Sequence, residues 1–304
     1  MQSRRKFRII TLLSCTAFLF TETVTVLAEE PLGFQTSGTL ENRNINEASG
    51  LQAGADGVFF THNDQKRDVF VLDARGRDLG SFKLDGAKNS DWEDITRIPG
   101  PGHPLLVIAD TGDNKHKRKD VELYFFKEPA AETFHEDQDV VHKLTIRYPD
   151  GPRDVESVAY DPASDDILIL SKRDVPPRLY SVPLKEALAE KELEATFLAE
   201  VPGFRPPTKT DVLSNPKRGL WVSQPTGMDI SPDGRMAAVI TYRSLYLFRR
   251  AEGETWAGAF QHPPEEIPGP PGTHDEAVAF SLDGKTVYVT TERRPAPIYR
   301  LELP

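Results

Sequence analysis

Short runs of Val, Ile, Leu, Phe and Tyr alternate along most of the chain with turns rich in Asp, Gly and Pro. In five segments, a polar or acidic residue precedes a short apolar run, a turn follows, and a second apolar run comes next. These segments are NEASGLQAGADGVFFTHND (46–64), WEDITRIPGPGHPLLVIADTGD (92–113), VESVAYDPASDDILILSKRD (155–174), PTGMDISPDGRMAAVITYRS (225–244) and DEAVAFSLDGKTVYVTTERR (275–294). Apolar runs separated by such turns predict β-hairpins.

A third strand is predicted after each hairpin, and a weaker fourth strand after the first four hairpins. The third strands are DVFVLD, VELYFFK, RLYSVPL, SLYLFRR and PIYRLEL, and the fourth are DLGSFKL, VVHKLTIRY, ATFLAEV and TWAGAF. The fifth repeat ends with the chain, so FQTSGTL (34–40) is expected to supply its fourth strand. That pairing would remove exposed sheet edges, which otherwise invite aggregation.

Repeats of four strands in roughly 40–50 residues are typical of a β-propeller. The pattern therefore predicts an all-β fold, a single β-propeller over residues 29–304, with five four-stranded blades and a ring closed by the N-terminal strand. Six blades are possible if residues 203–224 contain a degenerate unit. The run KEALAEKELEA is expected to form a short helix on the rim, and GFRPPTKTDVLSNPKRGLW a long loop.

Residues 1–28 read as a secretory signal peptide. A basic start precedes an apolar run from Ile9 to Phe20, and Val26-Leu27-Ala28 is the small-residue pattern of a cleavage site. The apolar run is too short to span a bilayer, which needs roughly 20 residues. We therefore expect a periplasmic or extracellular protein. Lipoprotein anchoring through Cys15 is disfavoured, because this cysteine lies inside the apolar run and not at its end.

Removal of the signal segment changes the charge and the cysteine count. The segment carries four Lys or Arg and one Glu, so its loss moves the net charge from −10 to −13. Cys15 is the only cysteine, so the mature chain has no disulfide and no thiolate metal site. The acidic balance argues against nucleic acid as a partner and against stable membrane insertion, but it would attract divalent cations.

The chain resembles a known group of proteins in EASGL, THND, VFVLDARG, DWEDI, ADTGDN, VELYFFKEP, ESVAYDP, DISPDGR, EAVAFSLDG, TTER and IYRL. These segments are similar to exported bacterial propellers and to the SdiA-regulated and phytase-like esterase propeller families. The resemblance spans nearly the whole mature chain and implies the fold. Relatives in the wider superfamily include calcium-dependent phosphatases, lactonases and binding scaffolds, and fold alone does not choose among them.

Alignment of the repeats on their turns places one polar position at the start of each innermost strand. The residues at this position are Glu47, Glu93, Glu156, Thr226 and Glu276. They are expected to ring one mouth of the central channel. Four carboxylates in a tunnel repel one another, so each needs a cation, an arginine or backbone donors.

The end of the second strand lies beside the start of the first in an antiparallel pair. The residues expected there are Asn63, Gly112, Arg173, Arg243 and Arg293. Glu156–Arg173 and Glu276–Arg293 are both separated by seventeen residues and are predicted structural ion pairs.

The first two blades lack such an arginine, and their mouth is predicted to be rich in oxygen ligands. The candidate metal ligands are Glu47, Asn63, Asp64, Asp91, Glu93, Asp110 and Asp113. Ca²⁺ binds six to eight oxygens of this kind. The alternative is that these Asx side chains cap turns and bind only their own backbone.

Two functions follow from these patterns. The first is a binding scaffold that takes a small anionic ligand or a protein partner at the channel mouth, where Ca²⁺ could also bind. The second is a metal-dependent hydrolase of lactonase or phosphoesterase type, with His62 or a carboxylate as the base and Arg243 holding an anionic group. The sequence contains no phosphate-binding glycine loop and no dinucleotide fingerprint, so no nucleotide or organic cofactor is expected.

Overall fold

The computed structural model describes residues 32–270, 275–292 and 294–304. The predicted signal peptide, residues 1–28, and the predicted ion-pair partner Arg293 lie outside the described residues. Strand pairing within the described ranges gives three sheets of four strands and one of nine, in which the first two repeats are joined edge to edge. Each of the five repeats of the sequence forms one unit of four antiparallel strands.

Each unit is named by its order in the chain. Unit one contains β2 (Ala48–Ala53), β3 (Val58–Asn63), β4 (Asp68–Asp73) and β5 (Asp78–Asp85). Unit two contains β6 (Asp94–Ile98), β7 (Leu105–Asp110), β8 (Val121–Lys127) and β9 (Gln138–Arg147). Unit three contains β10 (Val155–Asp161), β11 (Asp166–Ser171), β12 (Arg178–Pro183) and β14 (Thr196–Glu200). Unit four contains β15 (Pro225–Ile230), β16 (Met236–Thr241), β17 (Ser244–Arg249) and β18 (Glu265–Pro268). Unit five contains β19 (Asp275–Phe280), β20 (Thr286–Thr291), β21 (Pro297–Glu302) and β1 (Gln35–Thr39).

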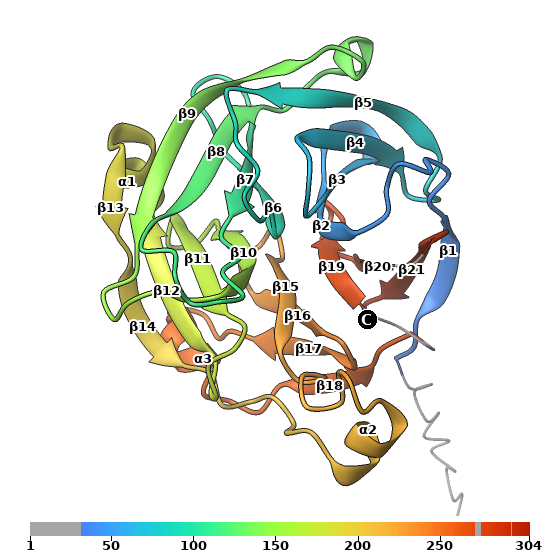
Figure 1. Cartoon of the computed structure of the whole chain (residues 1–304), viewed down its shortest axis with the longest axis vertical. Coiled ribbons are helices and arrows are strands. Elements are labelled where there is room, and N and C mark those ends of the chain that lie inside the picture. Colours follow the sequence, from blue (N-terminus) through green and yellow to red (C-terminus); the bar gives the residue numbers. More distant parts are fainter. Residues whose placement is uncertain (1–31, 271–274, 293) are drawn as a thin grey trace, which may run out of the picture. The chain divides into compact units, whose positions relative to one another are not determined.

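The first strands of the five units lie around the centre of the fold (Figure 1). In this ring β2 contacts β6, β6 contacts β10, β10 contacts β15, β15 contacts β19, and β19 returns to β2. The N-terminal strand β1 pairs with β21, with Gln35 opposite Arg300. The prediction of an all-β propeller closed by its N-terminal strand is therefore confirmed.

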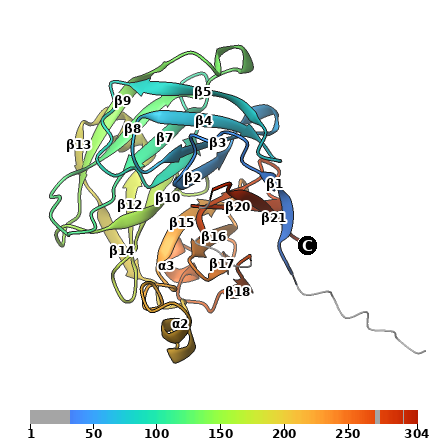
Figure 2. The ribbon, with the colours of Figure 1, turned by 45° about the vertical axis from the view of Figure 1, so that its right-hand side comes forward.

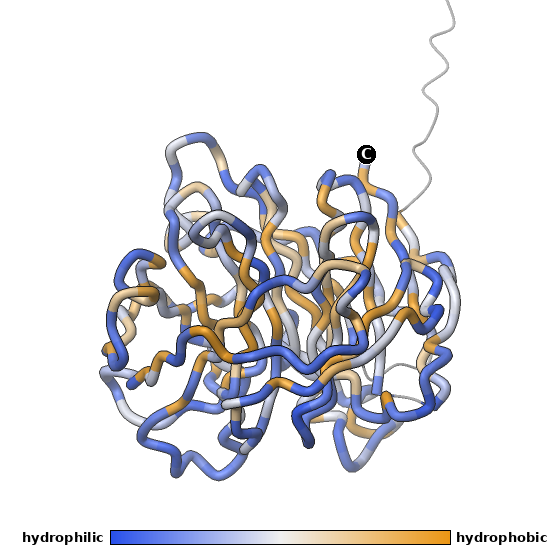
Figure 3. The backbone as a smooth tube through the Cα atoms, turned by 90° about the horizontal axis from the view of Figure 1, so that it is seen from above, coloured by the Kyte–Doolittle hydropathy of each residue, from blue (hydrophilic) through white to orange (hydrophobic). Residues whose placement is uncertain are grey.

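The hydrophobic core lies between neighbouring units. One cluster joins units one and two through Phe60, Ile108 and Tyr124, and another joins units two and three through Phe125 and Tyr180. Figure 3 shows hydrophobic positions concentrated along the inner segments and hydrophilic positions in the outer loops. Truncation of one of these buried aromatic side chains to alanine would cost about 3–5 kcal/mol.

Two buried carboxylates of the innermost strands also join the units. Asp94 Oδ2 in β6 accepts the backbone N–H of Val158 at 2.8 Å and that of Met228 at 3.4 Å. Asp229 Oδ2 in β15 accepts the N–H of Phe280 in β19 at 2.8 Å. These bonds tie one innermost strand to the next across the centre.

The fourth strand of unit four differs from the prediction. The run TWAGAF contains α3 (Trp256–Ala259), because Thr255 Oγ1 caps this helix by accepting the N–H of Gly258 at 3.3 Å. Trp256 and Phe260 then pack with their ring centroids 5.2 Å apart. The fourth strand is β18, which follows later in the chain.

Residues 203–224 form no sixth unit. They contain α2 (Lys209–Ser214) between two irregular stretches, and Figure 2 shows α2 standing out from the sheets. The run KEALAEKELEA contains most of α1 (Leu184–Ala189) and β13 (Glu192–Glu194), which pairs in parallel with β9. Two 3₁₀ turns, Ala55–Gly57 and Ala131–Thr133, complete the elements. None of the described helices has the length and apolar character needed to span a bilayer.

Candidate functional site

The first strands of the units begin where the second strands end, at one end of the ring that the first strands form. In three units the pairing register shifts by one residue here, at Glu156, Thr226 and Glu276. Such a β-bulge bends the strand and re-aims the side chain of the extra residue. In unit two, Glu93 directly precedes β6. The polar position that recurs in the sequence is therefore a repeated feature of the strand pairing.

A cavity of about 200 Å³ lies at this point, and we call it the mouth cavity. Its acidic lining residues are Asp64, Asp91, Glu93, Glu156, Glu276 and Glu292, and its cationic ones are Lys172, Arg173 and Arg218. Six carboxylates face three cations, so the lining carries three excess negative charges when all these groups are ionised. Residues from all five units contribute to it.

Glu93 has little to compensate its charge. It is 5% exposed, and its side chain's only hydrogen bond to a described residue comes from Ser49 Oγ at the long distance of 3.5 Å. Burial raises the pKa of Glu93 well above its ordinary value, the charges of Glu156 and Asp91 raise it further, and Lys172 lowers it. A buried carboxylate in this situation either binds a proton or requires a cation.

Glu156 has a different partner from the predicted one. Its Oε1 accepts a hydrogen bond from Lys172 Nζ, which also donates to Tyr242 Oη at 2.9 Å. Burial raises the pKa of Glu156 in spite of this ion pair. Arg173, the predicted partner, pairs through Nε with Asp154.

The difference arises from the register at the bulge. Ser171 is opposite Val155, so Lys172 is the first residue past the last pair. Successive side chains of a strand point to opposite sides, and an error of one residue exchanges the two directions. The same shift applies in unit four, where Tyr242 lines the mouth cavity and Arg243 does not.

Unit five brings two carboxyl groups together. Burial raises the pKa of Glu276 well above its ordinary value, as do the charge of Glu156 and a hydrogen bond with the Glu292 side chain. Two carboxyl groups this close favour a shared proton. Arg218 Nη1 donates to Glu292 Oε2 at 3.3 Å. Because Arg293 is not described, the Glu276–Arg293 ion pair stays a prediction.

Two oxygen atoms at the mouth cavity have no hydrogen-bond partner among the described residues. They are Asp64 Oδ1 and Gln224 Oε1, and both atoms are buried. Burial raises the pKa of Asp64 to about 7, with further contributions from the charges of Glu292 and Glu47. An unsatisfied buried oxygen costs about 1–3 kcal/mol. These two unpartnered oxygens therefore favour the binding of a cation or a hydrogen-bond donor.

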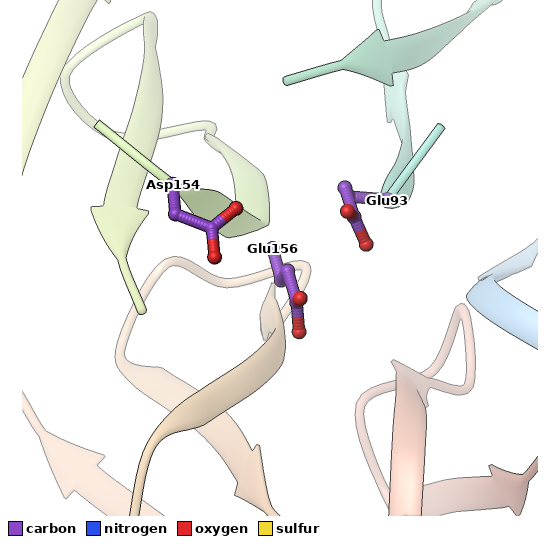
Figure 4. Close-up of side chains that lie close together, drawn as sticks. All are labelled: Glu93, Asp154 and Glu156. Carbon is purple, nitrogen blue, oxygen red and sulfur yellow. The ribbon is translucent and has the colours of Figure 1, made fainter. Parts of the chain in front are cut away.

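A compact group of three buried carboxylates borders the cavity. Glu93, Asp154 and Glu156 each place one oxygen within 4.8 Å of the others (Figure 4). Gly112 leaves room beside them, because a Cβ atom there would lie 2.1 Å from Glu93 Oε1 and 2.5 Å from Asp91 Oδ2. Ca²⁺ and Mg²⁺ bind carboxylate and amide oxygens. This buried trio could therefore bind a metal ion.

Among the predicted ligands of unit one, Asn63 binds the local backbone. Asn63 Oδ1 accepts the N–H groups of Asn46 at 3.0 Å and of Glu47 at 3.2 Å, and Asn63 Nδ2 donates to Asn44 O at 2.9 Å. The side chain of Glu47 does not line the mouth cavity. Asp64 is the predicted ligand of unit one that lines the mouth cavity.

Two predicted ligands of unit two also form loop contacts. Asp110 Oδ1 accepts the N–H of Asp91 at 3.0 Å and pairs with Arg118 Nη1 at 2.9 Å. Asp113 Oδ2 accepts the N–H of Arg118 at 2.7 Å. These contacts correspond to the alternative in which Asx side chains shape turns. Asp91 and Glu93 are the predicted ligands of unit two that line the cavity.

His62 lies in the core, although it was expected near the mouth. The side chain is fully buried and meets Trp92 edge-on, with ring centroids 5.6 Å apart. Burial lowers the pKa of His62 to about 4, so it is neutral at pH 7. A general base must reach the proton that it takes. His62 does not line the mouth cavity, whereas burial raises the pKa of two lining carboxyls, Asp64 and Glu156, to about 7.

Arg243 anchors the 203–224 segment and does not face the cavity. Its Nη1 pairs with Asp211 Oδ2 at 2.8 Å, and its Nη2 donates to Arg205 O at 2.5 Å and to Ser223 Oγ at 3.0 Å. An anion at the mouth cavity would instead meet the two arginines that line it.

Sequence reasoning missed six lining residues, Lys172, Arg218, Trp221, Gln224, Tyr242 and Glu292. Lys172, Tyr242 and Glu292 each precede a predicted position by one residue, so a bulge assigned at the recurring polar residue would have found them. The other three come from the 203–224 segment, which occurs once in the chain and has no repeat to align with.

Comparison with known proteins bears on the fold. Among solved structures, the chain is similar to the PQQ-bound form of aldose sugar dehydrogenase (Adh) from Streptomyces coelicolor. The TM-score is 0.50 and the identity 14%, over 89% of this chain and 98% of that chain. This chain shares the β-propeller fold. Identity this low carries no activity from one protein to the other. No protein-family model matches the sequence, and no curated protein matches it either.

Proposed function

We propose that this chain is an exported β-propeller that binds a divalent cation, Ca²⁺, in the mouth cavity. The bound ion and the nearby arginines hold a small anionic ligand or an acidic group of a protein partner. The observation that carries the proposal is the pair of buried, unpartnered oxygens, Asp64 Oδ1 and Gln224 Oε1, beside the poorly compensated carboxylate of Glu93. A cation supplies the positive charge that these oxygens lack.

The chemistry of the lining favours Ca²⁺ over softer metals. The described lining residues include carboxylates and amides but no histidine and no cysteine. Zn²⁺ and Cu²⁺ prefer imidazole and thiolate ligands, whereas Ca²⁺ takes six to eight oxygens. A volume of about 200 Å³ leaves room for an ion and several waters, each of which occupies about 30 Å³ in the liquid.

The cationic part of the lining supports an anionic ligand. Arg173 and Arg218 line the same cavity as the carboxylates, and the Arg173 guanidinium lies 5.8 Å from the centre of the Trp221 ring. Guanidinium groups bind carboxylates and phosphates in a bidentate manner. An anion bound between the cation and these arginines would compensate the positive charge of both. Export is proposed from the N-terminal sequence.

The test is the metal content of the purified mature protein, with its melting temperature measured in chelator and in added Ca²⁺. We expect one Ca²⁺ per chain and a higher melting temperature, because a ligand at 100 times its Kd stabilises the fold by about 2.7 kcal/mol. Glu93→Gln should abolish both effects. Glu265→Gln, which alters an exposed carboxylate on β18, should leave both unchanged. A wild type without bound metal and without a response to chelator contradicts the proposal.

A metal-dependent hydrolase of lactonase or phosphoesterase type is the second candidate, favoured by the pKa of about 7 that burial gives Asp64. A carboxyl group that titrates near neutral pH is suited to general acid–base catalysis. A bound metal would supply Lewis acidity to a substrate oxygen or a water. Asp64 would then accept the proton, the role that the sequence analysis considered for His62.

A screen of lactones and phosphoesters separates the two candidates. Turnover that requires Ca²⁺ and falls at least about 100-fold in Asp64→Asn supports the hydrolase, since general-base groups contribute about 10²–10⁴-fold. Ca²⁺ binding without turnover supports the binding scaffold.

A further inference from the structure

The 203–224 segment forms the part of the mouth cavity that does not come from the repeated units. It contributes Arg218, Trp221 and Gln224 to the lining. Arg218 contacts Glu292, and the Trp221 ring lies beside the guanidinium of Arg173. The segment therefore contacts the side chains that a cation and its anionic ligand would meet.

Few apolar contacts hold this segment in place. α2 buries none of its residues, and Leu213 and Leu220 are 80% and 68% exposed. An apolar anchor lies at the start of the segment, where Phe204 packs at 5.0 Å from Tyr246 and 5.8 Å from Phe248 between ring centroids. Segments with little buried apolar surface open locally at low free-energy cost.

Arg243 makes polar contacts at three points of the segment, and Arg205 and Arg218 add ion pairs with Glu266 and Glu292. Its guanidinium binds Arg205 O near the beginning, the Asp211 carboxylate in α2 and Ser223 Oγ near the end. The Arg243 side chain is 13% exposed and that of Asp211 is 19% exposed. Charged hydrogen bonds with this degree of burial are stronger than those between neutral groups. One side chain therefore holds three points of the segment.

We propose that the 203–224 segment is a gate over the cation site and that Arg243 is its latch. This inference rests on the proposed cation site. The closed segment retains the ion and excludes large ligands, and ions exchange when the segment opens. Release of the latch therefore speeds both entry and departure of the ion, while affinity changes less, because both rate constants rise together.

The direct test measures ion release with Tb³⁺, a luminescent substitute for Ca²⁺. Arg243→Gln removes the latch, and Asp211→Ala weakens it from the segment side if Arg243→Gln fails to fold. Arg249→Gln is the matched control, because Arg249 is an exposed residue of the same strand that pairs with Glu265. Stopped-flow mixing with excess chelator should show release about tenfold faster in both latch variants, with Kd changed less than threefold. Unchanged release in both would overturn the gate.

A second measurement follows the segment without any metal. Trp92 and Trp256 are 0% and 3% exposed, whereas Trp221 is 43% exposed, so acrylamide quenching of tryptophan fluorescence reports mainly on the segment. We expect stronger quenching and several-fold faster amide exchange across 203–224 in the latch variants than in Arg249→Gln. Faster opening without faster Tb³⁺ release would overturn the gate alone. Absence of Tb³⁺ binding in every variant, with opening still faster, would overturn the cation site and with it the gate.

Discussion

Glu93 and Asp94 are adjacent and both buried, yet their side chains have opposite surroundings. Asp94 accepts three backbone N–H groups, from Ile95 at 2.9 Å, Val158 at 2.8 Å and Met228 at 3.4 Å. Glu93 faces the mouth cavity with one long hydrogen bond. Burial raises the pKa of both carboxyls well above the ordinary value.

The difference teaches that burial alone does not identify a functional carboxylate. Asp94 accepts three backbone N–H groups and joins units two, three and four, so its role is architectural. Glu93 lacks donors and lies beside other carboxylates, so a cation is what it requires. The backbone bonds of Asp229 and the carboxyl contact of Glu276 show the same contrast between units four and five.

The largest effect is expected from Asp94→Ala. The substitution leaves three N–H groups in the interior without an acceptor, and each such group costs about 1–3 kcal/mol. We expect the free energy of unfolding in urea to fall by about 3–5 kcal/mol, equally in chelator and in Ca²⁺. A loss below about 1 kcal/mol, or a loss that Ca²⁺ reverses, would mean that Asp94 is not the architectural member of the pair.

The pH dependence of the metal-free protein comes next. Because the folded-state pKa of Asp64 is about 7 and its ordinary value is 3.8, the folded protein holds the proton more tightly than the unfolded chain. The resulting stability is full below pH 3.8 and is lost as pH rises through 7. In chelator, we expect the melting temperature to fall by several degrees from pH 5 to pH 8. In Ca²⁺, which binds the ionised form, this fall should disappear.

The contribution of His62 to stability changes with pH in the opposite direction, so the experiment needs a control that keeps it constant. Its folded-state pKa is about 4 and its ordinary value 6.5, so its contribution is lost as pH falls from 6.5 to 4. Comparison of the wild type with Asp64→Asn keeps the His62 contribution constant. A pH slope that is the same in the two proteins would rule out Asp64 as a source of it.

Glu93→Gln should have a smaller and opposite effect on stability. In chelator, the substitution removes a buried charge, and an amide can donate to the neighbouring carboxylates. We expect a gain of about 1 kcal/mol in the free energy of unfolding at pH 8, within the range of one hydrogen bond. Urea denaturation measures it. Destabilisation by more than 1 kcal/mol would place Glu93 with Asp94 as an architectural residue.

The smallest effect is expected from Gln224→Met. The side chain keeps its approximate volume but loses the amide oxygen, so Ca²⁺ affinity should fall about three- to tenfold, equivalent to about 1 kcal/mol. Calorimetric titration with Ca²⁺ measures the change, and Gln138→Met on the outer strand β9 is the control. Unchanged affinity would remove Gln224 from the ligand set.

The fold could be predicted because every unit repeats one hairpin pattern, and five copies make the strand assignments mutually consistent. Glu93, Glu156 and Glu276 were expected at the mouth and line its cavity. Their partners were not all found, because a bulge of one residue decides whether Lys172 or Arg173 pairs with Glu156. Gln224 could not be found, because no repeat reveals where its segment folds back.

The most direct test of the central claim is a crystal structure of the mature protein with Tb³⁺, located by its anomalous scattering. We predict a peak in the mouth cavity with Glu93 among the ligands and Asp64 within coordination distance. The same crystals of Glu93→Gln should lose this peak. Anomalous peaks confined to other acidic surfaces, with the mouth cavity holding none, would contradict the account.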